Sequence, residues 1–491
     1  MQTAQPILTK RKKLGYALGI ASESMLYNMY YTYFLTFLVQ IVHIRPNIAG
    51  VVIFISIGWD AVTDSVIGEL SDRPGVDKRK LMAKSILPLC IFFVLAWSGL
   101  GNTLFGENEA PKVIFYTLIS VAIWLFYTTY TIPYYAVIAE MTEDYDERTE
   151  IRGLSSFINA FCIGLGNVLP ALVGIAFIGY IHIAFLIAVL ATAAGAVCVT
   201  SLKGVYTPKP VPENFVKEKG LGIGKTIAIS GELMKLPPVK YFLLFVFFFL
   251  AGNSMLQSNL SYMVVNCIDM DYNTGIAIVI GVLVVTMAAF VPVVTRVCEK
   301  TDRRTACLIF ITVSAAGLAV MKFFGLDVTV GSFKIAVVLT PFLLGLGLST
   351  FWTVFYSMSY DIVELDEFVN GSNGERRESM ITALPQFVQK FGSATGILAQ
   401  GLILGAYGYN AAGDSGADAA TFVRPAEEIV KGMENISTVI PAAVVTVALI
   451  FLLLYPMTRK RYNILTEQLK AKRAGESYGT EGLGRLIGKS K

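Results

Sequence analysis

Asp60 and Asp64 stand within an apolar run that extends from Val51 to Gly68. A carboxylate at the centre of a bilayer costs roughly 2.5–3.5 kcal/mol even on the mildest insertion scale, so the pair must face a cavity, a cation or a proton. The four-residue spacing places both side chains on one face of a helix, one turn apart. The pattern predicts a cation or proton site; the alternative is a structural pair held by a lysine or by backbone groups.

The rest of the chain predicts an all-α membrane protein that positions this pair. Apolar residues make up 54% of the chain and charged residues 15%, against roughly 25% charged residues in a typical soluble domain. Stretches of about 20 apolar residues predict membrane-spanning helices. We expect twelve of them, near 14–42, 47–70, 82–101, 112–138, 153–177, 179–201, 239–265, 273–296, 305–324, 334–359, 381–408 and 436–456.

The twelve predicted spans form two sets of six. A hydrophilic stretch containing Pro208, Pro210 and Pro212 separates the sets. Two six-helix halves joined by a long linker are typical of the major facilitator fold, in which the substrate cavity lies between the halves. The expected domains are an N-terminal half at 1–202, a linker at 203–236, a C-terminal half at 237–457 and a basic tail at 458–491.

Basic residues predict the orientation, because Lys and Arg near span ends favour the cytoplasmic side. Basic clusters recur on one side of the predicted bundle, from Lys10–Lys13 at the beginning of the chain to Arg459–Arg461 near its end. We therefore expect a protein of the inner (cytoplasmic) membrane with both termini in the cytoplasm. This asymmetry explains the net charge of +4 without a nucleic-acid partner. The expected partners are the lipid bilayer and a small solute, with a monomer as the functional unit; the tail is either solvated or in contact with anionic lipid.

Several other activities find no support in the sequence. The six cysteines are scattered without paired spacing, and the two histidines, His43 and His182, both fall at predicted helix ends. A metal cluster or a Ser-His triad therefore cannot be assembled convincingly. A phosphate-cradling glycine loop is also missing, which argues against transport driven by ATP. We expect no enzyme and no cofactor, and energy taken from an ion gradient.

Four ordered strings carry a specific resemblance. They are WDAVTDSVIG at 59–68, IPYYA at 132–136, RRES at 376–379 and FVQKFGSA at 387–394. Together they resemble the glycoside-pentoside-hexuronide:cation symporter family, a melibiose permease-like branch of the major facilitator superfamily. The resemblance covers nearly the whole chain, and the ordered set is far more specific than any one string.

The resemblance implies a cation site and a coupling residue. It assigns Asp60 and Asp64 to binding of Na⁺ or H⁺, with Thr128 contributing a hydroxyl nearby. Thr63 occupies the place of a family asparagine; its hydroxyl is a shorter oxygen ligand, which leaves the choice between sodium and proton open. The resemblance also implies that Lys390 communicates between the cation and the substrate.

The substrate side departs from the family pattern. The charged family residues on helices 1, 4 and 5 align with Ser24 (preceded by Glu23), Thr131 and Ser156. A site that loses such contacts should change its substrate. Aromatic, amide and hydroxyl groups suit a sugar or another polyhydroxy compound, although tyrosine-rich stretches also serve as packing. The candidate substrate-binding residues are Glu23, Ser24, Tyr27, Tyr127, Thr131, Tyr134, Tyr135, Ser156, Trp352 and Gln386.

These features predict cation-coupled symport of a sugar, glycoside or uronide by alternating access. Charged residues at the inner helix ends are expected to act as latches between the halves. This candidate gate comprises Asp72, Arg73, Glu147, Arg148, Asp361, Glu364, Arg376 and Arg377. The alternatives are symport of a non-sugar solute, such as an organic acid, a zwitterion or a lysolipid, and a receptor that binds without transport.

Overall fold

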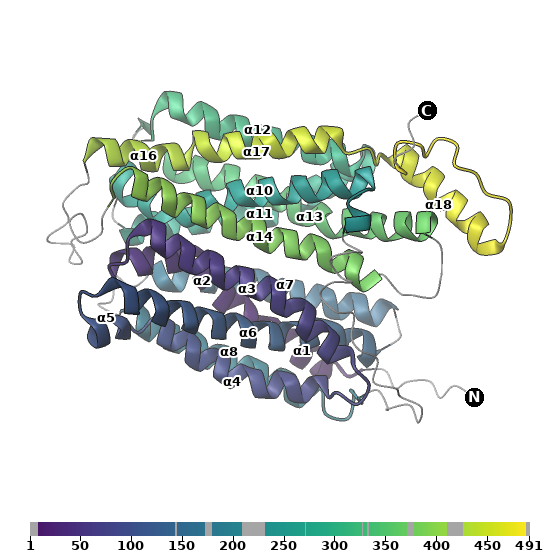
Figure 1. The fold of residues 1–491 in the computed structure, drawn as a ribbon, viewed down its shortest axis with the longest axis horizontal. Helices are drawn as coiled ribbons and strands as arrows, with labels where there is room; N and C mark the ends of the chain where they lie inside the picture. Colours follow the sequence, from purple (N-terminus) through teal and green to yellow (C-terminus); the bar gives the residue numbers. More distant parts are fainter. Residues whose placement is uncertain are drawn as a thin grey trace. The chain divides into compact units, whose positions relative to one another are not determined.

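The computed structural model describes most of the chain as helix. The described residues are 8–142, 145–171, 179–208, 231–270, 272–326, 328–330, 333–370, 378–409 and 426–487. They form mostly helices, as Figure 1 shows, and they divide into two compact units. The first unit contains the described residues up to 208 together with those of 264–281 and 397–432; the second contains the other described residues from 231 onward.

The described helices up to residue 208 all belong to the first unit. They are α1 (Lys10–Ala17), the short η1 (Leu18–Ile20), α2 (Ala21–Gln40), α3 (Pro46–Asp72), α4 (Lys78–Ala96), α5 (Leu100–Phe105), α6 (Glu109–Met141), α7 (Tyr145–Ala171) and α8 (Tyr180–Ser201). Helix α3 packs against α6, and α2 packs against α7 and α8. The α2–α7 approach is close at Gly166, where an added Cβ would lie 2.7 Å from the carbonyl oxygen of Met25. A residue without a side chain is therefore required at that crossing.

The later part of the chain is helical too, apart from one short hairpin. Its helices are α10 (Pro237–Tyr262), η3 (Met263–Cys267), α11 (Tyr272–Lys300), α12 (Arg303–Phe324), α13 (Ala336–Asn370), α14 (Glu378–Ala406), α16 (Glu427–Ser437), α17 (Val439–Leu454) and α18 (Arg459–Ala474). Strands β1 (Thr329–Val330) and β2 (Phe333–Lys334) pair antiparallel, with Thr329 opposite Lys334.

Local signals place the ends of these helices. Pro46 opens α3, where its missing N–H costs nothing because the first N–H groups of a helix have no partner inside it. Asp77 caps α4 by accepting a hydrogen bond from the Lys80 backbone at 3.2 Å. Asp302 caps α12 in the same way, accepting from the Thr305 backbone at 2.6 Å.

Nine helices in the described ranges are long and apolar enough to cross a membrane. Three further predicted spans, near 14–42, 82–101 and 381–408, coincide with the helices α1 to α2, α4 and α14. The expectation of an all-α membrane protein is confirmed, while the count of twelve spans stays a prediction. The domain boundaries also stay predictions, and most of the predicted linker, 209–230, lies outside the described residues.

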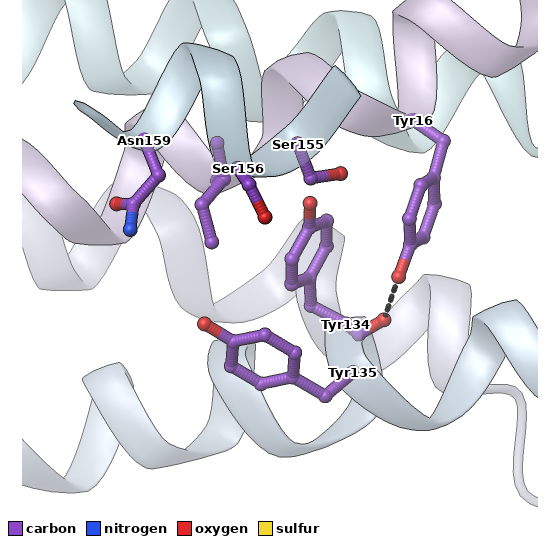
Figure 2. Close-up of a pocket in the computed structure, with 7 residues that line it drawn as sticks. Tyr16, Tyr134, Tyr135, Ser155, Ser156 and Asn159 are labelled. Atoms are coloured by element: carbon purple, nitrogen blue, oxygen red, sulfur yellow. Dashed lines mark hydrogen bonds between the residues drawn. The ribbon is translucent and has the colours of Figure 1, made fainter. Parts of the chain in front are cut away.

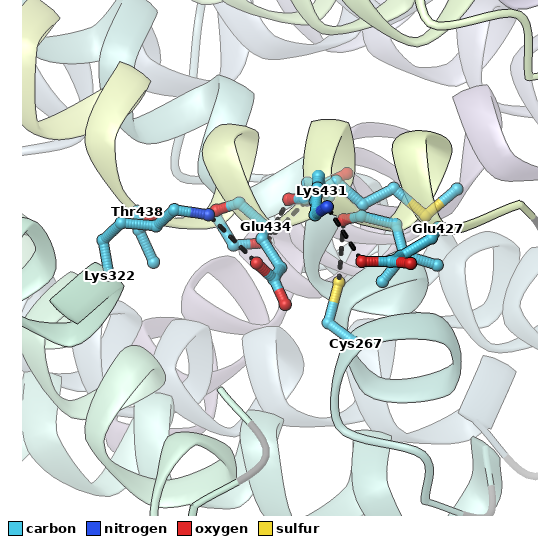
Figure 3. Close-up of polar contacts among 10 residues, drawn as sticks. Cys267, Lys322, Glu427, Lys431, Glu434 and Thr438 are labelled. Carbon is cyan, nitrogen blue, oxygen red and sulfur yellow. Dashed lines mark hydrogen bonds and ion pairs between the residues drawn. The ribbon is translucent and has the colours of Figure 1, made fainter. Parts of the chain in front are cut away.

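Polar contacts lie along α16, and one of them joins it to α12 (Figure 3). In the second unit, Lys322 of α12 forms an ion pair with Glu434 at 3.0 Å, and the Thr438 hydroxyl donates to the Glu434 carbonyl at 2.6 Å. In the first unit, Lys431 and Glu427 pair one turn apart at 2.8 Å.

Candidate cation and substrate site

The hydroxyl of Thr128 on α6 joins the two carboxylates of α3. Its Oγ1 lies 2.5 Å from Asp60 Oδ1 and 3.0 Å from Asp64 Oδ1. Asp60 and Thr128 are fully buried, and Asp64 is half-buried. The four-residue spacing predicts that both aspartates share one face of α3, and in the structure both contact Thr128 of α6.

The two carboxylates share one hydroxyl, and they repel each other when both are ionised. A threonine hydroxyl has one hydrogen, so it donates to only one carboxylate at a time. The second short contact is favourable when that carboxyl is protonated and donates to Thr128, or when a cation lies against the oxygens. The three residues thus form an acceptor-rich centre suited to a proton or a small hard cation.

Thr63 is placed differently from the other three predicted cation residues. It is buried, and its hydroxyl donates to the backbone carbonyl of Asp60 at 3.0 Å. Its side chain therefore lies beside the centre, with its hydrogen used by α3 itself. A direct role as a cation ligand stays a prediction.

A third carboxylate, that of Glu23 on α2, is held by two phenols of α6. Tyr135 donates to Oε1 in a short hydrogen bond, and Tyr127 donates to Oε2 at 3.4 Å. Glu23 is only 7% exposed, so these donors offset part of the cost of its burial. Tyr135 is itself 40% exposed, which leaves this end of the cluster open to a ligand.

Two tyrosine rings of α2 extend this cluster through Tyr127. Tyr27 stacks on Tyr31 with ring centroids 4.2 Å apart, and Tyr127 lies 6.1 Å from Tyr27. Such ring faces suit the apolar faces of a sugar or another flat or ring-shaped solute. Thr131 is buried in the following turn of α6.

A small cavity of about 110 Å³ lies next to this cluster (Figure 2). Tyr135, Ser155, Ser156 and Asn159 line it on one side of Tyr134. Tyr134 is a packing residue as well as a wall, because its ring stacks on Tyr16 at 4.8 Å and its carbonyl accepts the Tyr16 hydroxyl at 2.6 Å. Ser156, which aligns with a family arginine, therefore borders open space next to Tyr135.

Sequence reasoning missed a buried amide network between α2 and α7. Asn167 accepts the Thr32 hydroxyl at 2.6 Å and donates to Asn28 Oδ1 at 3.3 Å, and Asn28 donates to the Ser24 carbonyl at 2.8 Å. Ser24 is thus part of a network that fixes α2 against α7. Asn167 was the signal that could have revealed this network. It is an amide within the apolar span 153–177, and buried polar side chains need hydrogen-bond partners.

Other predicted site residues lie in the second unit. Trp352 on α13 packs its ring against Phe351 and Phe355, at 5.2 and 5.8 Å. Gln386 is exposed and Lys390 is half-buried, both on α14. Their parts in substrate binding and coupling stay predictions.

The structure describes some of the candidate gate residues and not others. Asp361 on α13 pairs closely with Arg303 of α12 and is 5% exposed, so its described partner belongs to its own unit. Glu364 follows one turn later on α13, and Arg73 is exposed just after α3 ends. Asp72 ends α3, and Glu147 and Arg148 belong to the first turn of α7; Arg376 and Arg377 lie outside the described residues.

The tail carries contacts that the sequence did not predict. Helix α18 packs on α13, where Arg473 forms a close ion pair with Glu367 and Lys472 donates to the Phe368 carbonyl at 2.8 Å. Leu465 and Leu469 of α18 are buried. This part of the tail is therefore a docked helix rather than a simply solvated segment.

Comparison with known proteins gives a consistent result. A family model described as MFS/sugar transport protein matches residues 15–459. An uncharacterized symporter of Synechocystis, sll1374, is 35% identical over 164 residues, which cover 32% of this chain and 29% of the relative. The inner membrane symporter YicJ of Escherichia coli is 27% identical over 149 residues, which cover 30% of this chain and 31% of the relative. The matched segments thus span about a third of these relatives.

Solved structures share the fold at low sequence identity. A mutant form of the nucleoside transporter NupG superposes with a TM-score of 0.63 at 12% identity, covering 90% of this chain and all of that chain. Tetrameric PepTSo2 gives 0.62 at 12% identity, covering 94% and 99% of the two chains. At this level of identity the likeness shows the fold alone.

Proposed function

The chain belongs to the MFS/sugar transport protein family, and from this premise we propose that it couples the entry of Na⁺ or H⁺ to that of a small polyhydroxy solute. It is a multi-pass membrane transporter and not an enzyme, and the resemblance to the symporter family is confirmed. One observation carries the proposed coupling: a single Thr128 hydroxyl lies within hydrogen-bonding distance of both Asp60 and Asp64.

The coupling ion acts on this pair. A bound Na⁺ or proton removes the repulsion between the carboxylates and the cost of burying their charge. If the ion is Na⁺, the carboxylates and Thr128 supply oxygen ligands; if it is H⁺, one carboxyl donates to the Thr128 oxygen. By linkage, an ion that favours the substrate-binding conformation raises substrate affinity, and substrate raises ion affinity equally.

The substrate meets Glu23 and the phenols around it. A carboxylate and tyrosine hydroxyls bind groups that donate hydrogen bonds, such as the hydroxyls of a sugar or glycoside. The same carboxylate favours a second candidate substrate, a zwitterion with an ammonium group, over an organic anion. A uronide would need its own carboxylate placed away from Glu23.

Transport then proceeds by alternating access. The loaded carrier rocks and releases both solutes to the cytoplasm, where both termini of this monomeric carrier lie. Lys390 communicates between ion and substrate, and the candidate gate residues form and break contacts at the inner helix ends.

Uptake into proteoliposomes tests this function. The full chain is reconstituted, an inward gradient of Na⁺ or of H⁺ is imposed, and labelled glycosides, pentosides, uronides and zwitterionic amines are offered. Accumulation of a sugar with one gradient establishes substrate class and ion together. Accumulation of a zwitterion alone selects the second candidate. Binding of a solute by folded protein without flux under either gradient would contradict symport and indicate a receptor.

A further inference from the structure

Two arginines of the second unit bind the chain where α17 ends. Arg304, in the first turn of α12, donates from Nε to the Leu452 carbonyl at 3.1 Å and from Nη2 to the Leu453 carbonyl at 2.5 Å. Arg461, in the first turn of α18, donates from Nη1 to the Pro456 carbonyl at 2.5 Å. Both guanidinium groups therefore lie against one short stretch of chain around the end of α17.

The segment after α18 runs back along that helix in the opposite direction. The Gly479 backbone N–H donates to Gln468 Oε1 at 2.7 Å. An added Cβ at Gly482 would lie 3.3 Å from Ile464 Cδ1. Each step of three residues forward in this segment thus corresponds to four residues back along α18. The next step places Arg485 beside the first turn of α18.

Arg485 therefore comes close to Arg461. Leu483 and Leu486 flank Arg485 and are buried, whereas Arg485 itself is exposed. Burial, together with the nearby charges of Arg485 and Arg304, lowers the pKa of Arg461 below the ordinary value for arginine. The three guanidinium groups form one group of positive charges, which we call the arginine cluster.

The arginine cluster has no carboxylate of its own. Among the described residues, none of its three side chains forms an ion pair with Asp or Glu, and its hydrogen bonds go to neutral carbonyl groups. Other arginines of the same unit are paired: Arg303 with Asp361, and Arg473 with Glu367. The repulsion between three like charges is therefore left for an external anion to offset.

The remaining donors indicate which anion fits. A guanidinium has five N–H donors and no acceptor, and the carbonyl groups use only two of those of Arg304 and one of those of Arg461. The planar fork of arginine matches the oxygens of a phosphate, to which it binds in a bidentate manner. A tetrahedral phosphate also presents its oxygens to more than one arginine at a time. The cluster thus has the chemistry of a phosphate site.

Apolar surface beside the cluster indicates where the phosphate comes from. The candidate membrane span that contains α17 ends at Leu454. Ile450, Leu453 and Leu454 of α17 are 50%, 56% and 51% exposed. Exposed apolar side chains of a membrane-spanning helix face lipid acyl chains. The arginines lie where this apolar surface ends, which is the level of the lipid headgroups.

We propose that Arg304, Arg461 and Arg485 bind the phosphate of an anionic phospholipid whose acyl chains lie along α17. The bound phosphate joins the beginning of α12, the beginning of α18 and the segment after α18. The lipid therefore stabilises the docked tail, because a ligand that binds only the folded arrangement favours it. This lipid site is independent of the proposed symport.

Native mass spectrometry of the full chain, titrated with phosphatidylglycerol, measures the Kd of the first bound lipid. Arg485→Gln is the test variant, because Arg485 is exposed and its replacement should not disturb folding. Lys470→Gln is the matched control: it removes the same charge from an exposed position of α18 outside the cluster. We expect the Kd to rise roughly fivefold in Arg485→Gln and to stay unchanged in Lys470→Gln. Equal values in all three proteins, or an equal rise in both variants, would overturn the site.

Thermal unfolding in detergent identifies the source of the phosphate. Wild type and Arg461→Gln are compared with phosphatidylglycerol, with diacylglycerol of the same chains, and with inorganic phosphate against chloride at equal ionic strength. We expect phosphatidylglycerol alone to raise the Tm of wild type by several degrees, and to raise that of Arg461→Gln by less. Stabilisation by inorganic phosphate without an effect of the lipid would overturn the lipid as the source. Equal stabilisation by diacylglycerol and phosphatidylglycerol would overturn the phosphate contact.

Discussion

Tyr127 and Thr128 are consecutive residues of α6, yet their hydroxyls reach carboxylates on two different helices. Tyr127 donates to Glu23 on α2, and Thr128 donates to Asp60 on α3. One peptide unit therefore connects the candidate substrate cluster to the candidate cation centre. A small shift of α6 on ion binding would change both clusters together, which gives the proposed coupling a short physical route.

Removing one carboxylate charge should abolish coupling while leaving the fold intact. Asp64→Asn keeps the shape of the side chain, and Asp64 is half-buried, so we expect normal insertion and loss of gradient-driven accumulation. Uptake under an imposed gradient measures this. Asp77→Asn is the control, because asparagine also caps α4. Normal accumulation in Asp64→Asn would show that coupling does not require the carboxylate pair.

The Thr128 hydroxyl should contribute measurably to the affinity for the coupling ion. Thr128→Val keeps the branched shape and removes the oxygen, whereas Thr128→Ser keeps the oxygen. Hydrogen bonds to charged groups contribute roughly 1.5–3 kcal/mol, so the valine variant should need roughly tenfold to a hundredfold more ion for half-maximal uptake. Equal ion dependence of the valine and serine variants would show that the hydroxyl is not a ligand.

The phenols that hold Glu23 should set substrate affinity. Tyr135→Phe removes one donor to Glu23, and we expect the KM for the transported solute to rise roughly tenfold with the ion dependence little changed. Tyr116→Phe serves as the control, because the buried Tyr116 lies on the same helix about five turns away and packs against Gly101. A KM that moves equally in both variants would contradict a specific role for Tyr135.

Arg303 and Asp361 should be energetically coupled within one unit. The variants Arg303→Gln, Asp361→Asn and the double variant form a cycle in which neighbours in direct contact show coupling of roughly 0.5–3 kcal/mol. Thermal unfolding in detergent measures it. Additive effects of the two substitutions would point to a partner for Asp361 outside this pair, as a latch between the halves requires.

The docked tail should come loose when its buried leucines are truncated. Leu465 and Leu469 are 0% and 2% exposed, so Leu465→Ala with Leu469→Ala removes most of the apolar anchor of α18. Limited proteolysis at the lysines of α18 should become at least tenfold faster. Glu467→Ala, at an exposed position of the same helix, should leave the rate unchanged. If the leucine variant is cut no faster, other contacts hold the helix.

From the sequence it was possible to predict the site residues that are charged and stand within an apolar helix. Asp60 and Asp64 were visible because carboxylates are costly in lipid and their spacing defines a helix face, and Thr128 followed from the family resemblance. The network around Asn167 was not visible, since neutral polar residues are common in membrane helices and only packing shows whether their hydrogen bonds are satisfied. The pairing of Arg303 with Asp361 joins residues of two helices, and no spacing along one helix reveals it.

The attachment of α18 to α13 has a practical consequence. Because Arg473 and Lys472 fasten the tail helix to the end of α13, a paramagnetic or fluorescent label on α18 travels with α13. Lys470 is exposed on α18, so a probe can be attached there without replacing any residue of the candidate site. A label on the tail can therefore record the movement of α13 in real time while the carrier transports its solutes.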